Sequence, residues 1–450
     1  MLLPIVWAGL IVAALAVPLS TSPLPWTDLA HNMSGAAANS WWEILVYSFR
    51  PNVEYRPLLH LWVKGAYELF GVGARPYFAL LLLQFAAVLG LLVWLFRPVG
   101  TRRGIAAAVA IACLAGLHSS RALFHIMPVN AYSMGVILLL AAAILAVERP
   151  NARLDWLLLF LTGASVLLLE SGLVVLPVVA VLLVRRAPGV SWRGAAATLA
   201  VVALYVAVRR RAGAEVPFVY TETGLGFGIP SVEEMRGIFE SAPWMFYAYN
   251  SISTLFTVLF SEPRQGVFVF VQSLLQDAVP GYKWVHVLTS TFTTLLVGIV
   301  LIALRPFSAR DRLLVAIGLV LIVFGSALGF LYTRDRIALT AGVGYVLLVY
   351  VCVAQLLERA RAMVPWRRAC ATVAVAALAL GWTIRTGEAG FQLRDAAWDF
   401  QMEWRHRFGD RPAGPAGSIE EQLRLDALSR TPADPTRDPS WSYRFFERKF

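Results

Sequence analysis

Long apolar segments recur through most of this chain and restrict it to one class of fold. A water-soluble domain has no place to bury so many of them, so a lipid bilayer is their natural solvent. Backbone polar groups in hydrocarbon must be satisfied within the segment, which favours helices. We therefore predict an all-α integral membrane protein, a polytopic helical bundle with about 11 transmembrane helices. The predicted spans are residues 2–19, 77–96, 104–117, 132–147, 155–169, 172–184, 194–208, 286–304, 313–332, 337–357 and 369–384.

The net charge of +11 comes largely from arginines that lie between these segments. Basic residues in short loops mark the cytoplasmic side of a membrane protein, so this pattern argues against a nucleic-acid partner. We interpret residues 2–19 as a retained first helix, because no basic region precedes the apolar run. We place the N-terminus in the cytoplasm, because nearly all of the short loops then assigned to the cytoplasm are rich in arginine. The Arg-rich loops then assigned to the cytoplasm are 97–103, 148–154, 185–193, 305–312 and 358–368.

This topology places two long loops, residues 20–76 and 212–285, on the outer face. It divides the chain into a transmembrane domain, 1–384, and an outer C-terminal tail, 385–450. Segments 155–169 and 172–184 could form one long helix, but a hairpin keeps the later arginine clusters inside. We expect residues 243–260 to form an interfacial or re-entrant helix within the second long loop.

The first outer loop carries candidate chemistry. Asp28 follows the first predicted helix, where a carboxylate can accept a proton from an acceptor hydroxyl. Arg56 follows Glu54 and Tyr55 and precedes a proline, and its planar fork of donors suits a phosphate or carboxylate. Simpler interpretations stay open: Asp28 as a helix cap or solvated acid, and Arg56 as an anchor at the membrane interface.

Charged groups at later helix ends are the other candidates. Arg211 ends a run of three arginines that the topology puts outside, against the charge rule. Such cations either hold a lipid phosphate or show that the topology is inverted there. Arg334 and Arg336 flank Asp335 in a tight turn, which is either a self-satisfied ion network or a phosphate ligand. Glu170, alone after a leucine run, either bonds to helix ends or is a functional acid.

Several common chemistries leave no trace in the sequence. It has no phosphate-binding Walker motif, no Gly-x-Ser-x-Gly turn and no dinucleotide fingerprint. Its three cysteines show no zinc spacing, and His118 and His125 lack partners at ligand spacing, so no metal site is predicted. A nucleotide in the cytoplasm is therefore not the evident source of energy.

Several short motifs follow one another along the chain. They are the acid at Asp28, Tyr55-Arg56-Pro57-Leu58, Tyr67 to Gly71, Leu168 to Pro177, Tyr205 to Arg211, Tyr332 to Arg336, and Arg394 to Trp398 with Trp404. Their order resembles the GT-C superfamily of membrane glycosyltransferases. The nearest likeness is to bacterial relatives of the protein O-mannosyltransferases and of the tetratricopeptide-bearing transmembrane O-mannosyltransferases.

This resemblance implies transfer of a sugar from a polyprenyl-phosphate-linked donor to a hydroxyl of a periplasmic glycan, lipid or protein, with inversion at the anomeric carbon. It implies a multi-pass protein of the bacterial inner membrane with a periplasmic tail, and it leaves open whether a divalent cation takes part. Carried over by position, Asp28 is the catalytic acid. The donor-phosphate ligands are Arg56, Arg211 and Arg336, and the lining residues are Glu54, Tyr55, Glu170 and Arg334.

The sequence also departs from the family pattern. Relatives often have two adjacent acids where this chain has Thr27 and Asp28, and the stretch from His118 to Leu123 contains no carboxylate. Leu169 stands where the family has a lysine. Two alternatives therefore remain: an enzyme like the O-antigen ligases or polymerases, and a non-catalytic membrane scaffold or transporter.

Overall fold

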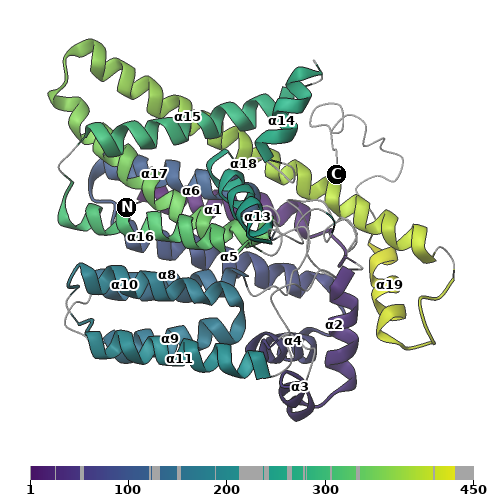
Figure 1. The fold of residues 1–450 in the computed structure, drawn as a ribbon. Coiled ribbons are helices and arrows are strands. Elements are labelled where there is room, and N and C mark those ends of the chain that lie inside the picture. The colour runs from purple at the N-terminus through teal and green to yellow at the C-terminus, as the bar shows by residue number, and fades with distance from the viewer. Residues whose placement is uncertain are drawn as a thin grey trace.

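The chain folds into a helical bundle, described here from a computed structural model (Figure 1). The residues that the structure describes form helices and turns, with no strand among them. They are residues 2–25, 27–50, 55–120, 123, 132–148, 154–187, 189–211, 237, 243–260, 266–276, 279, 281–304, 307–330, 335–408 and 411–430.

The helices follow one another along the chain. In the first half they are α1 (Leu2–Leu19), α2 (Thr27–Ala38), α3 (Trp41–Tyr47), α4 (Pro57–Phe70), α5 (Ala74–Phe96), α6 (Gly100–Gly116), α8 (Tyr132–Glu148), α9 (Leu154–Leu168), the 3-10 helix η1 (Glu170–Val174), α10 (Val175–Val184) and α11 (Trp192–Arg211). In the second half they are α13 (Pro243–Phe260), α14 (Gly266–Leu275), α15 (Gly281–Ala303), α16 (Ala309–Ala327), η2 (Asp335–Ala338), α17 (Leu339–Arg359), η3 (Ala360–Ala362), α18 (Pro365–Phe408) and α19 (Ile419–Ser429).

The apolar segments predicted from the sequence coincide with helices, which makes this a multi-pass membrane protein. Within the described residues, six helical stretches are long and apolar enough to cross a bilayer, and three more are apolar but shorter. The six are Leu2–Leu19, Ala74–Phe96, Trp192–Arg209, Lys283–Ala303, Arg336–Ala362 and Pro365–Gln401. The shorter three are Tyr132–Ile144, Leu154–Leu168 and Glu170–Val184.

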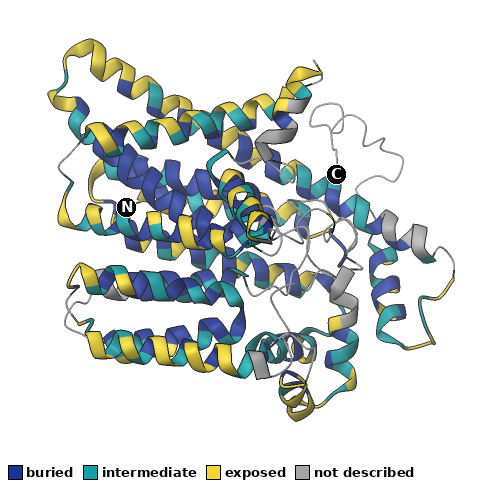
Figure 2. Cartoon of the chain, in the orientation of Figure 1, coloured by how far each residue is buried: buried dark blue, intermediate teal, exposed yellow. Residues whose placement is uncertain are grey.

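Helix α17 forms the centre of the bundle. In its apolar stretch 94% of the residues are buried, against 22% for α1, whose outward side chains face the surroundings (Figure 2). Helix α16 approaches α17 so closely that a Cβ atom on Gly318 would lie 2.8 Å from the carbonyl oxygen of Gly344. Small residues at a helix crossing allow this contact, which apolar side chains alone do not drive in lipid.

Residues 154–184 form the predicted hairpin. Helices α9 and α10 are separate, contact each other and lie side by side, with η1 between them (Figure 1). The turn is tight: a Cβ on Gly172 would meet the backbone of Ser165 at 2.4 Å, so only glycine fits there. The hairpin therefore puts Glu170, the first residue of η1, at the end of the bundle from which the chain turns back.

The C-terminal region packs against the segment that follows α1, which the sequence predicts to be an outer loop. Helix α18 runs without a break past residue 384, where the amphipathic tail was predicted to begin. The indole of Trp404 donates a hydrogen bond of 2.8 Å to the carbonyl oxygen of Leu24, and Ser34 of α2 donates one of 2.5 Å to Glu420 of α19. Figure 1 shows α2, α3, α4 and α19 together at one end of the bundle.

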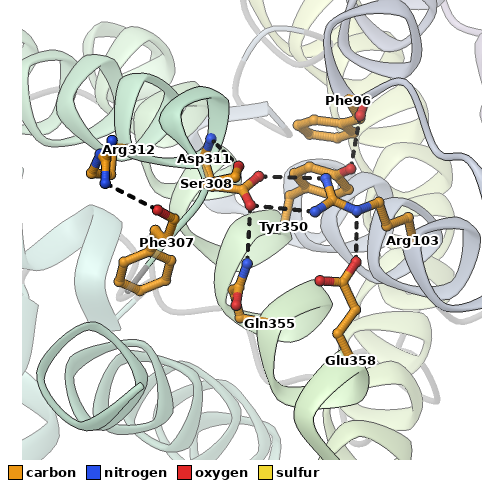
Figure 3. Close-up of polar contacts among 9 residues, drawn as sticks. All are labelled: Phe96, Arg103, Phe307, Ser308, Asp311, Arg312, Tyr350, Gln355 and Glu358. Atoms are coloured by element: carbon orange, nitrogen blue, oxygen red, sulfur yellow. Dashed lines mark hydrogen bonds and ion pairs between the residues drawn. The ribbon is translucent and has the colours of Figure 1, made fainter. Parts of the chain in front are cut away.

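An ion-pair cluster closes the opposite end of the bundle. Helix α5 begins close to α4 and extends about 34 Å at 1.5 Å per residue, so its last residue lies at the far end. There Arg103 of α6 binds Asp311 of α16 and Glu358 of α17, with nitrogen-to-oxygen distances of 3.3 and 2.7 Å (Figure 3). Gln355 donates a further hydrogen bond of 3.0 Å to Asp311. We call these four residues the Arg103 cluster.

Candidate functional site

Two arginines from distant parts of the chain meet on one carboxylate at the end of the bundle that carries α2 to α4. The Nε of Arg56 donates to both carboxylate oxygens of Glu170, at 2.9 and 3.0 Å. Arg209 donates to the same carboxylate and, at 2.9 Å, to the hydroxyl of Tyr205. We call Arg56, Glu170, Tyr205 and Arg209 the Arg56 cluster.

The local structure explains why these side chains converge. Arg56 occupies the N-cap position of α4, and Pro57 follows at the first helical position, where a missing amide hydrogen costs no helical hydrogen bond. Glu170 begins η1 at the hairpin turn, where the backbone leaves α9 through an extended Leu169. Arg209 lies one helical turn after Tyr205 near the end of α11, so the two side chains share a face. Each charged group is thus at a helix end, where it can reach water.

The cluster is partly open to solvent. The exposed fractions of the side chains of Arg56, Glu170 and Arg209 are 18%, 24% and 27%. This exposure lets an incoming anion reach the guanidinium groups without unfolding the site. Formal charges give a net +1 for these three side chains, which favours an anionic ligand.

An aromatic wall backs the charged groups. The ring of Tyr55 packs against Tyr205 and Phe49, with centroid separations of 5.8 and 5.0 Å. One turn into α4, His60 forms a hydrogen bond of 2.7 Å with Ser48. Burial, and then the charge of Arg56, lower the pKa of His60 to about 4, so this imidazole is neutral near pH 7.

Glu170 is held as an anion. Burial alone would raise its pKa, but the charges of Arg56 and Arg209 outweigh burial and lower the pKa to about 2. A carboxylate with this pKa cannot act as a proton acceptor at neutral pH. Its chemical role is therefore to position two guanidinium groups, which otherwise would repel each other.

Of the other site residues predicted from the sequence, the structure describes some in full, some by their backbone alone, and some not at all. Asp28 lies in the first turn of α2 and Arg211 is the last residue of α11, but their side chains fall outside the described part. Glu54 and Arg334 lie outside the described residues altogether. Arg336 lies in η2, and its Nε is buried without a hydrogen-bond partner within the described structure. The structure therefore brings Arg56, Tyr55 and Glu170 together, and among the described residues Arg336 forms no hydrogen bond or ion pair with them.

Arg209 and Tyr205 were not among the predicted site residues. The sequence singled out the run of three arginines and then selected Arg211 from it. The spacing of four residues between Tyr205 and Arg209 was the available signal, because it places both on one helix face. Because Glu170 also binds Arg56, the contact of Arg209 with Glu170 places Arg209 at the same end of the bundle as Arg56.

A second polar cluster lies deeper in the bundle. His118 contacts His286 of α15 at 3.0 Å, and His286 in turn binds Glu388 of α18. All three side chains are buried, and Gln392 also donates to Glu388, at 2.6 Å. Even so, no group of three or more His, Cys, Asp or Glu side chains in the described part is placed to hold a metal ion.

Comparisons with known proteins give two solved structures. No family model matches this chain, and no curated protein matches it. ArnT from Cupriavidus metallidurans bound to undecaprenyl phosphate aligns over 97% of this chain and 87% of its own, with 15% identity and a TM-score of 0.33. The same protein in the apo state aligns over 93% and 83%, with 16% identity and a TM-score of 0.33. TM-scores below 0.5 establish no common fold, so the function of this chain has to be inferred from its own residues.

Proposed function

We propose that this protein is a membrane glycosyltransferase of the GT-C type. It transfers a sugar from a polyprenyl-phosphate-linked donor to an acceptor hydroxyl on the outer face of the membrane. The observation that carries this proposal is the Arg56 cluster: two guanidinium groups, positioned by one ionised carboxylate, at the exposed end of a bundle of apolar helices. Three of the motifs that resemble GT-C enzymes contain the four members of this cluster.

The position of the cluster suits a phosphate on a lipid. A polyprenyl chain requires the apolar flank of a membrane protein, whereas its phosphate requires cations at the boundary. Guanidinium groups bind phosphate oxygens through paired hydrogen bonds, and Glu170 holds two of them within reach of one ligand. In the proposed complex the phosphate binds Arg56 and Arg209, and Tyr55 and Tyr205 flank the sugar.

Asp28 is the proposed general base. The acceptor oxygen attacks the anomeric carbon, the bond from that carbon to the phosphate oxygen breaks, and the proton of the acceptor hydroxyl passes to Asp28. The leaving polyprenyl phosphate keeps the bonding electron pair, and the arginines stabilise its developing charge. Because this is a single displacement, the product has inverted configuration. Helix α2, which carries Asp28, packs against α4, which begins after Arg56.

Further residues complete the proposed donor site. Arg211 follows Arg209 by two positions, and Arg336 begins the outer end of a central span. Both are proposed as additional phosphate ligands, with Arg334 and Glu54 lining the site. A divalent cation, if the reaction needs one, would have to be held partly by the substrate phosphate.

The location and division of the chain belong to the same proposal. The protein lies in a bacterial inner membrane with its N-terminus in the cytoplasm, so the Arg56 cluster faces the periplasm. Residues 1–384 form the transmembrane domain, and residues 385–450 form a periplasmic tail that covers the first outer loop through α19. The acceptor is a hydroxyl of a periplasmic glycan, lipid or protein.

Sugar transfer by the purified protein tests this proposal. The wild type and Asp28→Asn are incorporated into liposomes with labelled polyprenyl-phosphate sugars and candidate acceptors. We expect transfer by the wild type, and a loss of about 10²-fold or more in Asp28→Asn, because general base catalysis contributes that much. Donor binding should be unchanged, since Asp28 is assigned to the acceptor.

Asp155→Asn is the matched control. Asp155 lies in the first turn of α9, at the opposite end of that helix from Glu170. It accepts hydrogen bonds of 2.9 and 2.6 Å from the amide and the hydroxyl of Ser191, in the connection between α10 and α11. Its replacement should leave transfer per folded molecule unchanged. Equal transfer by the wild type and Asp28→Asn would show that Asp28 is not the general base. Failure of the wild type to transfer sugar from any donor would favour the scaffold or transporter interpretation.

A further inference from the structure

A hollow between the ends of three helices is separate from the Arg56 cluster. It has a volume of about 390 Å³ and lies where α1 ends, α5 begins and α19 ends. The described residues that line it are Ser20, Thr21, Arg75, Ser429 and Arg430, so two guanidinium groups and three hydroxyl groups face one space. No carboxylate is among them. The lining therefore has the chemistry of an anion site.

The two arginines are prepared for a ligand in different ways. Arg75, the second residue of α5, is exposed and makes no hydrogen bond or ion pair with another described residue. Arg430 is fixed by Asp426, whose carboxylate accepts from its Nε at 2.8 Å and from its Nη2 at 3.0 Å. This pair leaves the third guanidinium nitrogen of Arg430, Nη1, for another acceptor.

The hydroxyl groups can turn toward an anion. Ser20 and Thr21 now donate to carbonyl oxygens of the last turn of α1, at 2.7 and 3.1 Å, and Ser429 donates to Asp426 at 2.8 Å. Each of these is a local bond between a side chain and the backbone nearby. A hydroxyl hydrogen rotates freely enough to exchange such a bond for one to a phosphate oxygen.

The apolar surface beside the hollow indicates where the ligand comes from. Val17, three residues before Ser20, is 72% exposed on the apolar helix α1. On α5, Leu83 is 67% exposed and lies eight residues after Arg75, on the same helix face. In a span these exposed side chains contact lipid. Acyl chains along α1 and α5 would thus place a headgroup at the height of Ser20 and Arg75.

We propose that this hollow binds the phosphate of a membrane phospholipid. The phosphate contacts Arg75 and the residues that follow α1, and Arg430 at the end of α19 contacts the same headgroup. The lipid thereby bridges the outer ends of two spans and the C-terminal helix. This site does not depend on the proposed transferase function, because it shares no residue with the Arg56 cluster.

Binding of short-chain lipids to the full-length protein in a phosphate-free maltoside detergent tests the proposal. The ligand is dioctanoyl phosphatidylglycerol, measured by titration calorimetry against dioctanoylglycerol, which lacks phosphate, and against inorganic phosphate. The proteins are the wild type, Arg75→Gln, Arg75→Lys and Arg193→Gln. Arg193 is a matched control because it is also the exposed second residue of an apolar span, α11.

We expect phosphatidylglycerol to bind the wild type at least about tenfold more tightly than either comparison ligand, since a charge-assisted hydrogen bond contributes that much. Arg75→Gln should lose about tenfold in affinity, whereas Arg75→Lys should lose less and Arg193→Gln nothing. An unchanged affinity in Arg75→Gln, or an equal loss in Arg193→Gln, would overturn the site. Inorganic phosphate that binds as tightly as the lipid would overturn the lipid as its source.

Discussion

The two ends of the bundle each carry a cluster of charged residues, and the clusters differ in charge balance. In the Arg103 cluster one guanidinium serves two carboxylates; Asp311 is only 1% exposed, whereas Arg103 and Glu358 are 20% and 37% exposed. In the Arg56 cluster two guanidinium groups share one carboxylate, and all three charged side chains are 18–27% exposed. One cluster has acceptors in excess, and the other has donors in excess.

The different charge balance suits the two clusters to different roles: the Arg103 cluster to holding helices together, and the Arg56 cluster to binding a ligand. The Arg103 cluster joins α6, α16 and α17, and Tyr350 beside it stacks on Phe96 at 4.0 Å and donates to its carbonyl oxygen at 2.7 Å. Each guanidinium nitrogen of Arg103 already donates to Asp311 or Glu358. The Arg56 cluster joins a capping residue, a hairpin turn and a helix end, and it is open to water. An excess of exposed donors is suited to an anion from outside.

The largest expected effect comes from removing both cations of the Arg56 cluster. In Arg56→Gln/Arg209→Gln, Glu170 loses its partners and a bound phosphate loses two charged hydrogen-bond donors. We expect kcat/KM for sugar transfer to fall by about 10²–10⁴-fold, from the usual 1.5–3 kcal/mol for each charged hydrogen bond. A steady-state assay in liposomes measures this. A fall of less than about tenfold would remove the cluster from the donor site.

Removing the single cation of the Arg103 cluster should affect stability instead. In Arg103→Gln, Asp311 keeps Gln355 but loses the charge that compensates it, which costs about 3 kcal/mol. Thermal unfolding in detergent should show a lower melting temperature, while transfer per folded molecule at low temperature stays near that of the wild type. Suppose instead that transfer by Arg103→Gln falls as far as in Arg56→Gln/Arg209→Gln while its melting temperature is unchanged. The Arg103 cluster would then take part in transfer, and the assigned difference between the two clusters would be wrong.

A matched pair of acid variants sharpens the comparison. Glu170→Gln removes the anion that holds two arginines, so we expect donor affinity to fall by about tenfold. Glu358→Gln removes a partly exposed acid from Arg103, which keeps Asp311, and should leave donor affinity unchanged. Binding of a fluorescent polyprenyl phosphate measures both. Equal losses of donor affinity in the two variants would show that the losses come from general destabilisation of the protein and not from the donor site.

The smallest expected effect is on the pH dependence of stability. The pKa of Glu170 in the folded protein is about 2, below its usual value of 4.5. Its stabilising contribution is therefore complete above about pH 4.5 and is lost as the pH falls toward 2. The pKa of His60 is also lowered, from 6.5 to about 4. Between these pH values His60 is protonated in the unfolded protein but neutral in the folded protein, so the folded protein loses stability as the pH falls through that range.

Unfolding curves from pH 7.5 to 3 separate these two groups. His60→Gln should remove the part of the stability loss that occurs between pH 6.5 and 4. Glu170→Gln should differ from the wild type by a constant amount above pH 4.5, and this difference should shrink only below that pH. A difference that already shrinks near pH 6 would assign Glu170 a raised pKa and contradict its pairing with two arginines.

The sequence predicted the spans and half of the Arg56 cluster for definite physical reasons. Hydropathy marks a helix in lipid regardless of its neighbours, so each predicted span coincides with a helix. Arg56 and Glu170 stood out because charge at a helix end in a membrane is costly. Arg209 was missed because choosing among three consecutive arginines requires knowing which helix face meets the α9–α10 turn.

Other features depended on tertiary contacts that no single segment encodes. Arg103 and the acids Asp311 and Glu358 are 208 and 255 residues apart along the chain, and the sequence marks them only as loop charges. Likewise α18 continues past residue 384 because its amphipathic part packs on α19 and on the segment that follows α1. Hydropathy predicts only where the chain leaves the lipid, whereas the end of a helix also depends on the tertiary contacts that its polar part makes.

Equilibrium binding of a polyprenyl phosphate by the purified protein tests most directly that the Arg56 cluster is a donor-phosphate site. The measurement compares the wild type, Arg209→Gln and Arg209→Lys in the same detergent, each checked for an unchanged melting temperature. The account predicts saturable binding by the wild type, a loss of about tenfold or more in Arg209→Gln and a smaller loss in Arg209→Lys. Identical affinities in all three proteins would contradict it.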